Sequence, residues 1–154
     1  MISEIQIAYG SRVSLHGSSL LCLRYQRRRG ARIRRSGSRV REACEVMCRL
    51  DVGAVVVLDG QELVGVLSER DVIRKVVCPG LRTAETPVAD VMTGSPRTID
   101  ANGNLALALE IMSEGGFHHV PVLENGKTVG LLSADDIPEE YRMMLERFKE
   151  MRGV

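Results

Sequence analysis

Aromatic residues are scarce in this sequence: there is no Trp, and only two Phe and three Tyr occur among 154 residues. A chain of this length is long enough to bury one ordinary hydrophobic core. That core must therefore be built from Val, Leu, Ile, Ala and Met. Long apolar runs are missing as well, because no stretch approaches the roughly 18 residues that would suggest a membrane-spanning helix.

Paired cysteines are also missing. Cys22, Cys44, Cys48 and Cys78 form no C-x-x-C motif, which is typical of a protein of the reducing cytoplasm rather than of a disulfide-stabilised domain. Cys44 and Cys48 lie one helical turn apart and could in principle ligate a metal ion. We interpret them instead as buried apolar positions on an amphipathic helix, and we expect no metal site.

Signatures of catalysis are absent too. The sequence has no G-x-S-x-G motif, no P-loop, no paired-carboxylate cleft signature and no Cys–His pair at a spacing that indicates a nucleophile. We therefore expect a protein that is not an enzyme and that has no obligatory cofactor.

Positive charge is concentrated at the start of the chain. The formal net charge is +1, yet residues 1–41 contain ten Arg, no Lys and one acidic residue, a local charge of +9. Clustered Arg favours binding to a nucleic-acid backbone, although Tyr25 alone would supply base stacking. Such a segment is also typical of an organellar presequence, and a divergent or mistranslated segment is a third interpretation. All three stay open for residues 1–39.

The rest of the chain contains an internal repeat. The segment GVLSERD at residues 65–71 returns as GLLSADD at residues 130–136, an offset of 65 that holds without a gap over about thirty residues. Identical residues in the two copies include Ala43 and Ala108, Glu45 and Glu110, Met47 and Met112, Val55 and Val120, and Gly65 and Gly130.

Each copy shows the same order of hydrophobic patterns. Residues 40–50 and 105–112 have helical spacing. Two short apolar runs separated by a turn with Gly follow each helix and predict a hairpin. A helical pattern then resumes, and in the second copy Pro138 is expected to bend or delay its start. With a short extended piece before each first helix, the predicted order is strand, helix, strand, strand, helix.

These motifs carry a family resemblance. A-x-E-x-M at residues 43–47, DVMT at 90–93, HHVPV at 118–122 and the two S-x-x-D endings together resemble a tandem pair of CBS (cystathionine-beta-synthase-type) domains, a Bateman module. The resemblance implies an α/β fold of the α+β kind, with two β-α-β-β-α repeats packed as a pseudo-two-fold pair. We expect repeat 1 at residues 40–78, a linker at 79–97, and repeat 2 at 98–154 with a long C-terminal helix.

The S-x-x-D endings have two compatible interpretations. Ser68 and Asp71 match a capping box, in which each side chain bonds to the backbone N–H of the other residue. A helix N-terminus also attracts phosphate, and the resemblance implies that Asp71 and Asp136 bind ribose while Ser68 and Ser133 lie beside the phosphates.

The resemblance implies further lining for such a site. His118 and His119 would face the phosphates, although neighbouring side chains on a strand point to opposite faces, so that at most one is expected to reach a given site. Thr98 and Ile99 would border the base. Val120 and Pro121 would form its wall. Arg70 is as well explained by a phosphate contact as by a solvated helix start.

The first repeat has a poorer set of these residues. Gly53, Ala54 and Val56 occupy the positions of His118, His119 and Pro121, and the strand that matches Thr98 and Ile99 would be Ile33 and Arg34 within the Arg-rich stretch. We therefore predict unequal sites, the stronger of which uses Asp136.

Together these features predict a regulatory, energy-sensing module of the cytoplasm. It would bind an adenosine-containing nucleotide, AMP or ATP first and S-adenosylmethionine or NAD as secondary candidates, and would signal to an unknown protein partner. The alternatives are a partner-binding module with empty sites and a nucleic-acid-binding protein that uses its basic arm. We also predict a homodimer through apolar helix faces, with these residues: Cys44, Met47, Met143, Met144, Leu145, Phe148 and Met151.

Overall fold

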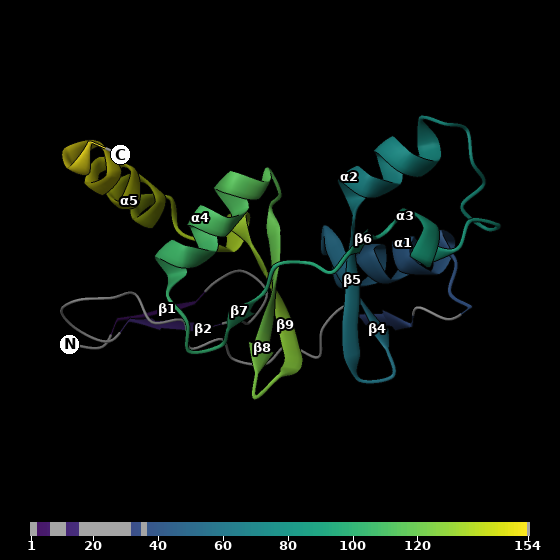
Figure 1. Cartoon of the computed structure of the whole chain (residues 1–154), viewed down its shortest axis with the longest axis horizontal. Helices are drawn as coiled ribbons and strands as arrows, with labels where there is room; N and C mark the ends of the chain where they lie inside the picture. The colour runs from purple at the N-terminus through teal and green to yellow at the C-terminus, as the bar shows by residue number, and fades with distance from the viewer. Residues whose placement is uncertain (1–2, 7–11, 16–31, 35–36, 154) are drawn as a thin grey trace.

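The computed structural model describes residues 3–6, 12–15, 32–34 and 37–153. Two halves lie side by side along the longest axis, and each half consists of a small sheet covered by helices (Figure 1). A separate antiparallel hairpin precedes them, formed by β1 (Ser3–Gln6) and β2 (Arg12–Leu15). The predicted α+β fold class is confirmed.

The first half follows the predicted order. Strand β3 (Arg32–Arg34) is parallel to β4 (Ala54–Asp59), which pairs antiparallel with β5 (Glu62–Ser68). The helices are α1 (Val40–Leu50), α2 (Glu69–Val72) and the π-helical turn η1 (Ile73–Val77). The linker adds α3 (Val88–Val91) and β6 (Thr93–Gly94), and β6 completes a sheet of order β3-β4-β5-β6.

The second half repeats this arrangement in a sheet of order β7-β8-β9. Its strands are β7 (Ile99–Asp100), β8 (His119–Glu124) and β9 (Lys127–Ser133). Its helices are α4 (Leu105–Gly115), the 3-10 turn η2 (Ala134–Asp136) and α5 (Glu139–Arg152). The predicted element order is therefore present twice.

The offset of 65 seen in the sequence is also a structural offset. Ala54 pairs with Ser68 in the first hairpin, and His119 pairs with Ser133 in the second. Both hairpins carry an irregularity at the same point, after Val57 in β4 and after Val122 in β8. The predicted repeat thus determines strand register as well as element order.

The border strand is an exception to this offset. Ile33 lies opposite Val57, whereas Ile99 lies opposite Val122, so Ile33 corresponds to Ile99. The predicted match of Ile33 with Thr98 was therefore wrong by one residue. The connection from the border strand to the first helix is one residue longer in the first half, and a gap-free comparison cannot accommodate that difference.

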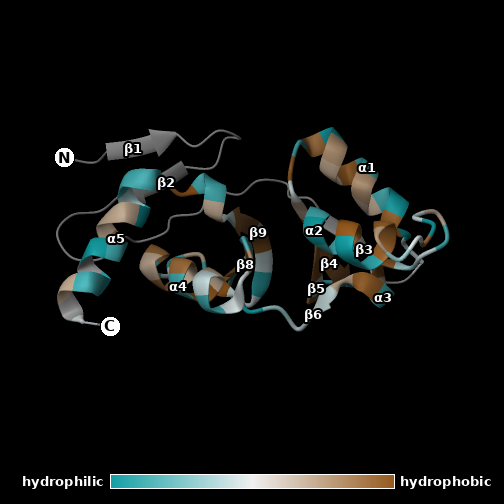
Figure 2. Cartoon of the chain, turned by 90° about the horizontal axis from the view of Figure 1, so that it is seen from above, coloured by the Kyte–Doolittle hydropathy of each residue, from teal (hydrophilic) through white to brown (hydrophobic). Residues whose placement is uncertain are grey.

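Two aliphatic clusters, one in each half, form the core, as the scarcity of aromatic residues predicts. Hydrophobic residues concentrate on the strands and on the helix faces that cover them (Figure 2). Helix α1 buries Val40, Ala43 and Met47. Burial of a side chain as large as Val40 or Met47 contributes about 1.5–3 kcal/mol. Met47 is 4% exposed, so its predicted place in an external interface was wrong.

Two predictions about the cysteines can be compared with the structure. Cys44 is half-buried, as expected for an amphipathic helix, whereas Cys48 is exposed, so its predicted burial was wrong. The reason is the phase of α1: Ala43 and Met47 face the sheet, and Cys48 lies one residue beyond that face. Among the described residues, no group of three or more His, Cys, Asp or Glu could hold a metal ion.

Pro138 delays the last helix as predicted. After the turn η2, Ile137 is extended and 2% exposed, and Pro138 is the N-cap of α5. A residue before proline is disfavoured in helical conformation, and proline itself suits the start of a helix. None of the helices in the described part of the chain combines the length and the apolar character needed to cross a membrane.

Candidate functional site

The two S-x-x-D motifs lie where β5 and β9 end. In the first, the backbone N–H of Asp71 donates to Ser68 Oγ at 3.2 Å, and the backbone N–H of Ser68 donates to Asp71 Oδ2 at 3.1 Å. The Ser68 hydroxyl also donates to Oδ2 at 2.9 Å. The predicted capping box is confirmed, and it leaves Oδ2 fully engaged.

The other oxygen of Asp71 faces a lysine. Nζ of Lys75 lies 2.8 Å from Asp71 Oδ1 and donates to the backbone carbonyl of Val91 at 2.9 Å. The Asp71 side chain is 18% exposed. Both oxygens of this carboxylate are therefore held in place at a helix start.

The second motif forms a capping box as well. The backbone N–H of Ser133 donates to Asp136 Oδ2 at 3.1 Å, and the N–H of Asp135 donates to Ser133 Oγ at 3.3 Å. The helical turn here is the short η2 rather than an α-helical turn, because Pro138 follows two residues after its end.

A cavity of about 600 Å³ lies between the two halves. This volume is within the usual range for small-ligand sites. Its lining comes from both halves and from the linker between them: Gly53, Val66, Ser68, Glu69, Arg70, Asp71, Arg74, Thr93, Ser95, Pro96, Arg97, Gly115, Gly116, Phe117, His118, His119 and Asp135. We call it the inter-repeat pocket.

The inter-repeat pocket brings together five of the residues predicted from the sequence. Ser68, Arg70 and Asp71 come from the first half, and His118 and His119 from the second. The expectation that at most one of the two His reaches a given site was wrong. Strand β8 begins at His119, so His118 precedes it and the alternation of side chains along a strand does not apply.

Six predicted residues are not among those that line the pocket: Thr98, Ile99, Val120, Pro121, Ser133 and Asp136. Ile99 and Val120 are 4% and 0% exposed and belong to the core of the second half. The border strand is offset by 66, so the linker wall at residues 93–97 corresponds to residues 27–31, which lie outside the described residues. The predicted stronger site at Asp136 therefore stays a prediction.

Two contacts between the halves involve Gly53 and Arg70. In the sequence, Gly53 stands where the second repeat has His118. A Cβ atom on Gly53 would lie 3.4 Å from both Cε1 and Nε2 of His119. Position 53 thus lies directly beside the His119 ring, which comes from the other repeat. The guanidinium of Arg70 also crosses between the halves and donates to the carbonyl of Gly116 at 3.4 Å.

Positive charge in the pocket comes from Arg side chains rather than from His119. Burial, and then the neighbouring His118, lower the pKa of His119, while Asp135 acts in the opposite direction. The His119 imidazole is therefore neutral at neutral pH. Arg70, Arg74 and Arg97 supply positive charge, and Arg97 shares it with Glu114 at 2.9 Å.

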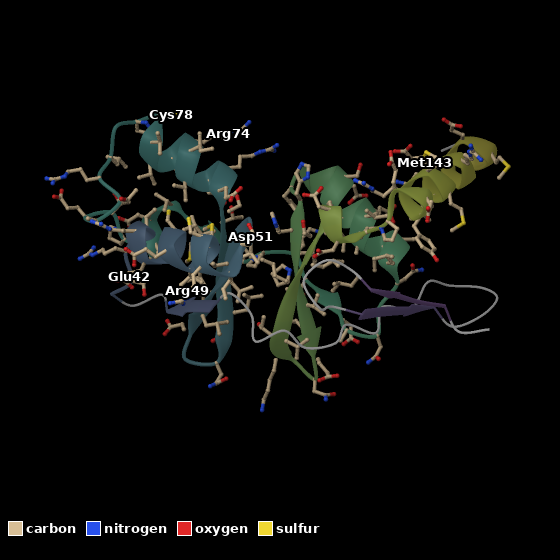
Figure 3. The ribbon with its side chains drawn as sticks, turned by 180° about the vertical axis from the view of Figure 1, so that it is seen from behind. Glu42, Arg49, Asp51, Arg74, Cys78 and Met143 are labelled. Atoms are coloured by element: carbon tan, nitrogen blue, oxygen red, sulfur yellow. The ribbon has the colours of Figure 1, made fainter. Side chains whose placement is uncertain are left out.

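Sequence reasoning missed several pocket residues. Arg74, labelled in Figure 3, lines the pocket and follows Arg70 by one helical turn. Lys75 is not among the lining residues, but it follows Asp71 by the same interval and contacts it. That i,i+4 spacing was a usable signal. Nothing in the sequence marks residues 93–97 or 115–117 as pocket walls, because their role depends on how the two sheets pack together.

Comparison with known proteins identifies the two halves. A family model described as the CBS domain matches residues 35–78 and 88–141. The chain belongs to the CBS domain family. Among curated relatives, a CBS domain-containing protein of Arabidopsis thaliana, CBSCBSPB1, is 37% identical over 92 residues, which are 59% of this chain and 17% of that protein. A mitochondrial CBS domain-containing protein of the same plant is 30% identical over 117 residues, 70% of this chain and 57% of the relative. The chain thus spans less than two thirds of these relatives.

Solved structures share this fold. A CBS domain protein from Pyrobaculum aerophilum in complex with AMP has a TM-score of 0.69 at 28% identity, covering 79% of this chain and 92% of that one. An uncharacterized conserved protein from Pyrococcus horikoshii has a TM-score of 0.64 at 34% identity, covering 72% and 83%. The predicted CBS pair is confirmed.

Proposed function

We propose that this CBS pair binds an adenosine-containing nucleotide in the inter-repeat pocket and signals its level to a protein partner. AMP and ATP are the first candidates, and S-adenosylmethionine and NAD are secondary ones. The observation that carries the proposal is the meeting of Ser68 and Asp71 with Arg and His side chains of both repeats around one cavity.

The chemistry of the pocket suits a nucleoside phosphate. The Asp71 carboxylate is a charged acceptor for ribose hydroxyls, and hydrogen bonds to charged groups are stronger than neutral ones. Arg70, Arg74 and His118 offer donors to phosphate oxygens. Val66 and Pro96 provide apolar surface for a base. The AMP complex of the Pyrobaculum relative supports the choice of an adenine nucleotide.

Binding in this pocket would join the two repeats. Its walls come from α2, from the linker and from the loop between α4 and β8, so a ligand there would contact segments of both repeats at once. The resulting change in how the repeats pack is the signal that a regulated partner would read. A regulatory rather than catalytic role is in keeping with the CBS family match.

Isothermal titration calorimetry with AMP, ATP, NAD and S-adenosylmethionine tests the proposal, with GTP as the non-adenine control. We expect saturable binding of an adenine nucleotide and weaker binding of GTP. No heat with any of these compounds at millimolar concentration would contradict it and would favour a partner-binding module with empty sites. The nucleic-acid alternative concerns residues 1–39, most of which lie outside the described residues, and stays a prediction.

We also infer that two copies associate through exposed apolar helix faces. Helix α5 exposes Met143 at 47%, Met144 at 39% and Met151 at 75%, and it lies at the end of the molecule away from the first repeat (Figures 1 and 3). Leu145 is half-buried, and the Phe148 side chain lies outside the described residues. Exposed apolar patches of this kind mark interfaces.

Light scattering coupled to gel filtration tests the homodimer. A dimer at micromolar concentration is expected for the wild type. The double variant Met143→Glu/Met144→Glu should shift it to monomer, because it places like charges on both copies of the face. If the wild type is monomeric both with and without nucleotide, the inferred homodimer is wrong.

A further inference from the structure

Lys75 connects Asp71, which lines the inter-repeat pocket, to the linker that follows the first repeat. Its Nζ contacts Asp71 Oδ1 at 2.8 Å and the Val91 carbonyl at 2.9 Å. Asp71 belongs to α2, and Val91 ends α3, immediately before the linker segment at residues 93–97 that also lines the pocket. One side chain thus joins the S-x-x-D carboxylate to the linker.

We propose that Lys75 is a positioning residue of the nucleotide site: it holds the Asp71 carboxylate in the orientation that accepts a ribose hydroxyl and thereby sets the preference of this site for ribonucleotides. The inference rests on the function proposed above and adds a determinant of specificity to it.

The hydrogen bonds of Asp71 show why a positioning group matters. An ionised carboxylate offers about four acceptor positions, two on each oxygen. Ser68 fills two of them on Oδ2, through its N–H and its hydroxyl. Lys75 fills one on Oδ1. The oxygen with an acceptor position left for ribose is therefore the one that Lys75 holds.

Lys75 acts on a nucleotide in two ways that can be separated. Its charge offsets that of Asp71 near an anionic ligand, and this effect is the same for nucleotides with and without ribose hydroxyls. Positioning of Oδ1 matters only when a hydroxyl is present. The ratio of the two affinities therefore reports positioning and is insensitive to the net charge of the site.

The connection belongs to the first repeat. At the offset of 65 the second repeat has Glu140 in place of Lys75, and Pro138 separates η2 from the helix that carries Glu140. The two S-x-x-D motifs therefore share their capping boxes but differ in the residue that follows one turn later.

The test measures ATP and its dideoxy analogue, which lacks both ribose hydroxyls, by calorimetry on the full chain. We expect the wild type to prefer ATP by about tenfold or more, the scale of a lost charged hydrogen bond. Lys75→Met should reduce this preference to about threefold or less. Lys75→Arg keeps a cation that can reach both Asp71 Oδ1 and the Val91 carbonyl oxygen, so this variant should keep the preference for ATP. Lys127→Met, an exposed lysine in the β8–β9 hairpin, should leave it unchanged.

Failure of this inference and failure of the proposed function give different results. If Asp71→Asn abolishes the preference for ATP over its dideoxy analogue but Lys75→Met retains it, the role of Lys75 is overturned and the proposed nucleotide binding is not. A wild type that binds neither compound overturns the proposed function, and the ribose role of Lys75 with it.

A measurement without ligand tests the tie to the linker separately. Amide hydrogen exchange at residues 92–97 should be several-fold faster in Lys75→Met than in Lys127→Met, since the first variant loses the bond to the Val91 carbonyl. Equal exchange in the two variants would overturn this part of the inference.

Discussion

Replacing Asp71 by Asn separates the capping role of the first S-x-x-D motif from its proposed ribose role. The amide has nearly the shape of the carboxylate and keeps one acceptor oxygen. It loses the charge that faces Lys75 at 2.8 Å and one of the two acceptor atoms that serve Ser68 and Lys75.

The cost in stability follows from these contacts. Loss of charge at a helix start costs about 0.5–1 kcal/mol. The ion pair adds about 0.5 kcal/mol or less, because Lys75 is 42% exposed and solvent screens the pair. We expect the free energy of unfolding to fall by about 0.5–1.5 kcal/mol. Urea denaturation would measure it.

The cost in binding is larger if Asp71 holds ribose. Removing a charged acceptor should weaken nucleotide binding in the inter-repeat pocket by about 1.5–3 kcal/mol, more than tenfold. Asp90→Asn, at an exposed carboxylate of α3, is the matched control and should bind like the wild type. A folded Asp71→Asn protein with unchanged affinity would reduce the motif to a helix cap and refute the reasoning.

Three further predictions concern other parts of the site. Asp136→Asn should weaken the tighter of two nucleotide sites by more than Asp71→Asn weakens its own, as calorimetry can show; equal losses would contradict the predicted inequality. The pKa of His119 is lowered in the folded protein, so the unfolded chain binds more protons once the pH falls below the usual His pKa, and the free energy of unfolding decreases there. His119→Gln should therefore make the melting temperature less dependent on pH between about pH 7 and 5. An unchanged pH dependence in this variant would assign the effect to another group. Gly115→Ala should cost about 1–3 kcal/mol and weaken nucleotide binding, because its Cβ would overlap the ring of Phe117, a pocket residue; a variant as stable as the wild type that binds as tightly would show that the ring moves freely.

Most of the fold could be predicted from the internal repeat. Once residues 65–71 and 130–136 were aligned, the offset predicted both hairpins and the two helices that precede them, and the S-x-x-D spacing predicted both capping boxes. These features are local, because a hairpin register or a helix cap depends on residues a few positions apart. The delay of the last helix by Pro138 was predictable for the same reason.

The inter-repeat pocket was only partly predictable. The motif residues were found, but His118 and His119 were assigned to their own repeat, and the structure places them beside Ser68 and Asp71 of the other one. Gly53 looked like a missing ligand, whereas it lies beside the His119 ring of the other repeat. Such pairings depend on how the two sheets face each other, and a comparison of each repeat with its own copy contains no information about that packing.

Errors of register had a similar origin. Ile33 was matched to Thr98 instead of Ile99 because the connection before α1 is one residue longer than the connection before α4. A single inserted residue reverses which side chains of a short strand face the core, and no motif marks the insertion.

The most direct measurement is a crystal structure of the full chain grown with the nucleotide that binds best in calorimetry. We predict density for the nucleotide between the two repeats, with a ribose hydroxyl within hydrogen-bond distance of Asp71 Oδ1 and the phosphates facing Arg70, Arg74 and His118. An inter-repeat pocket that is empty in crystals grown with saturating nucleotide would contradict the account. So would a bound nucleotide whose ribose does not contact Asp71.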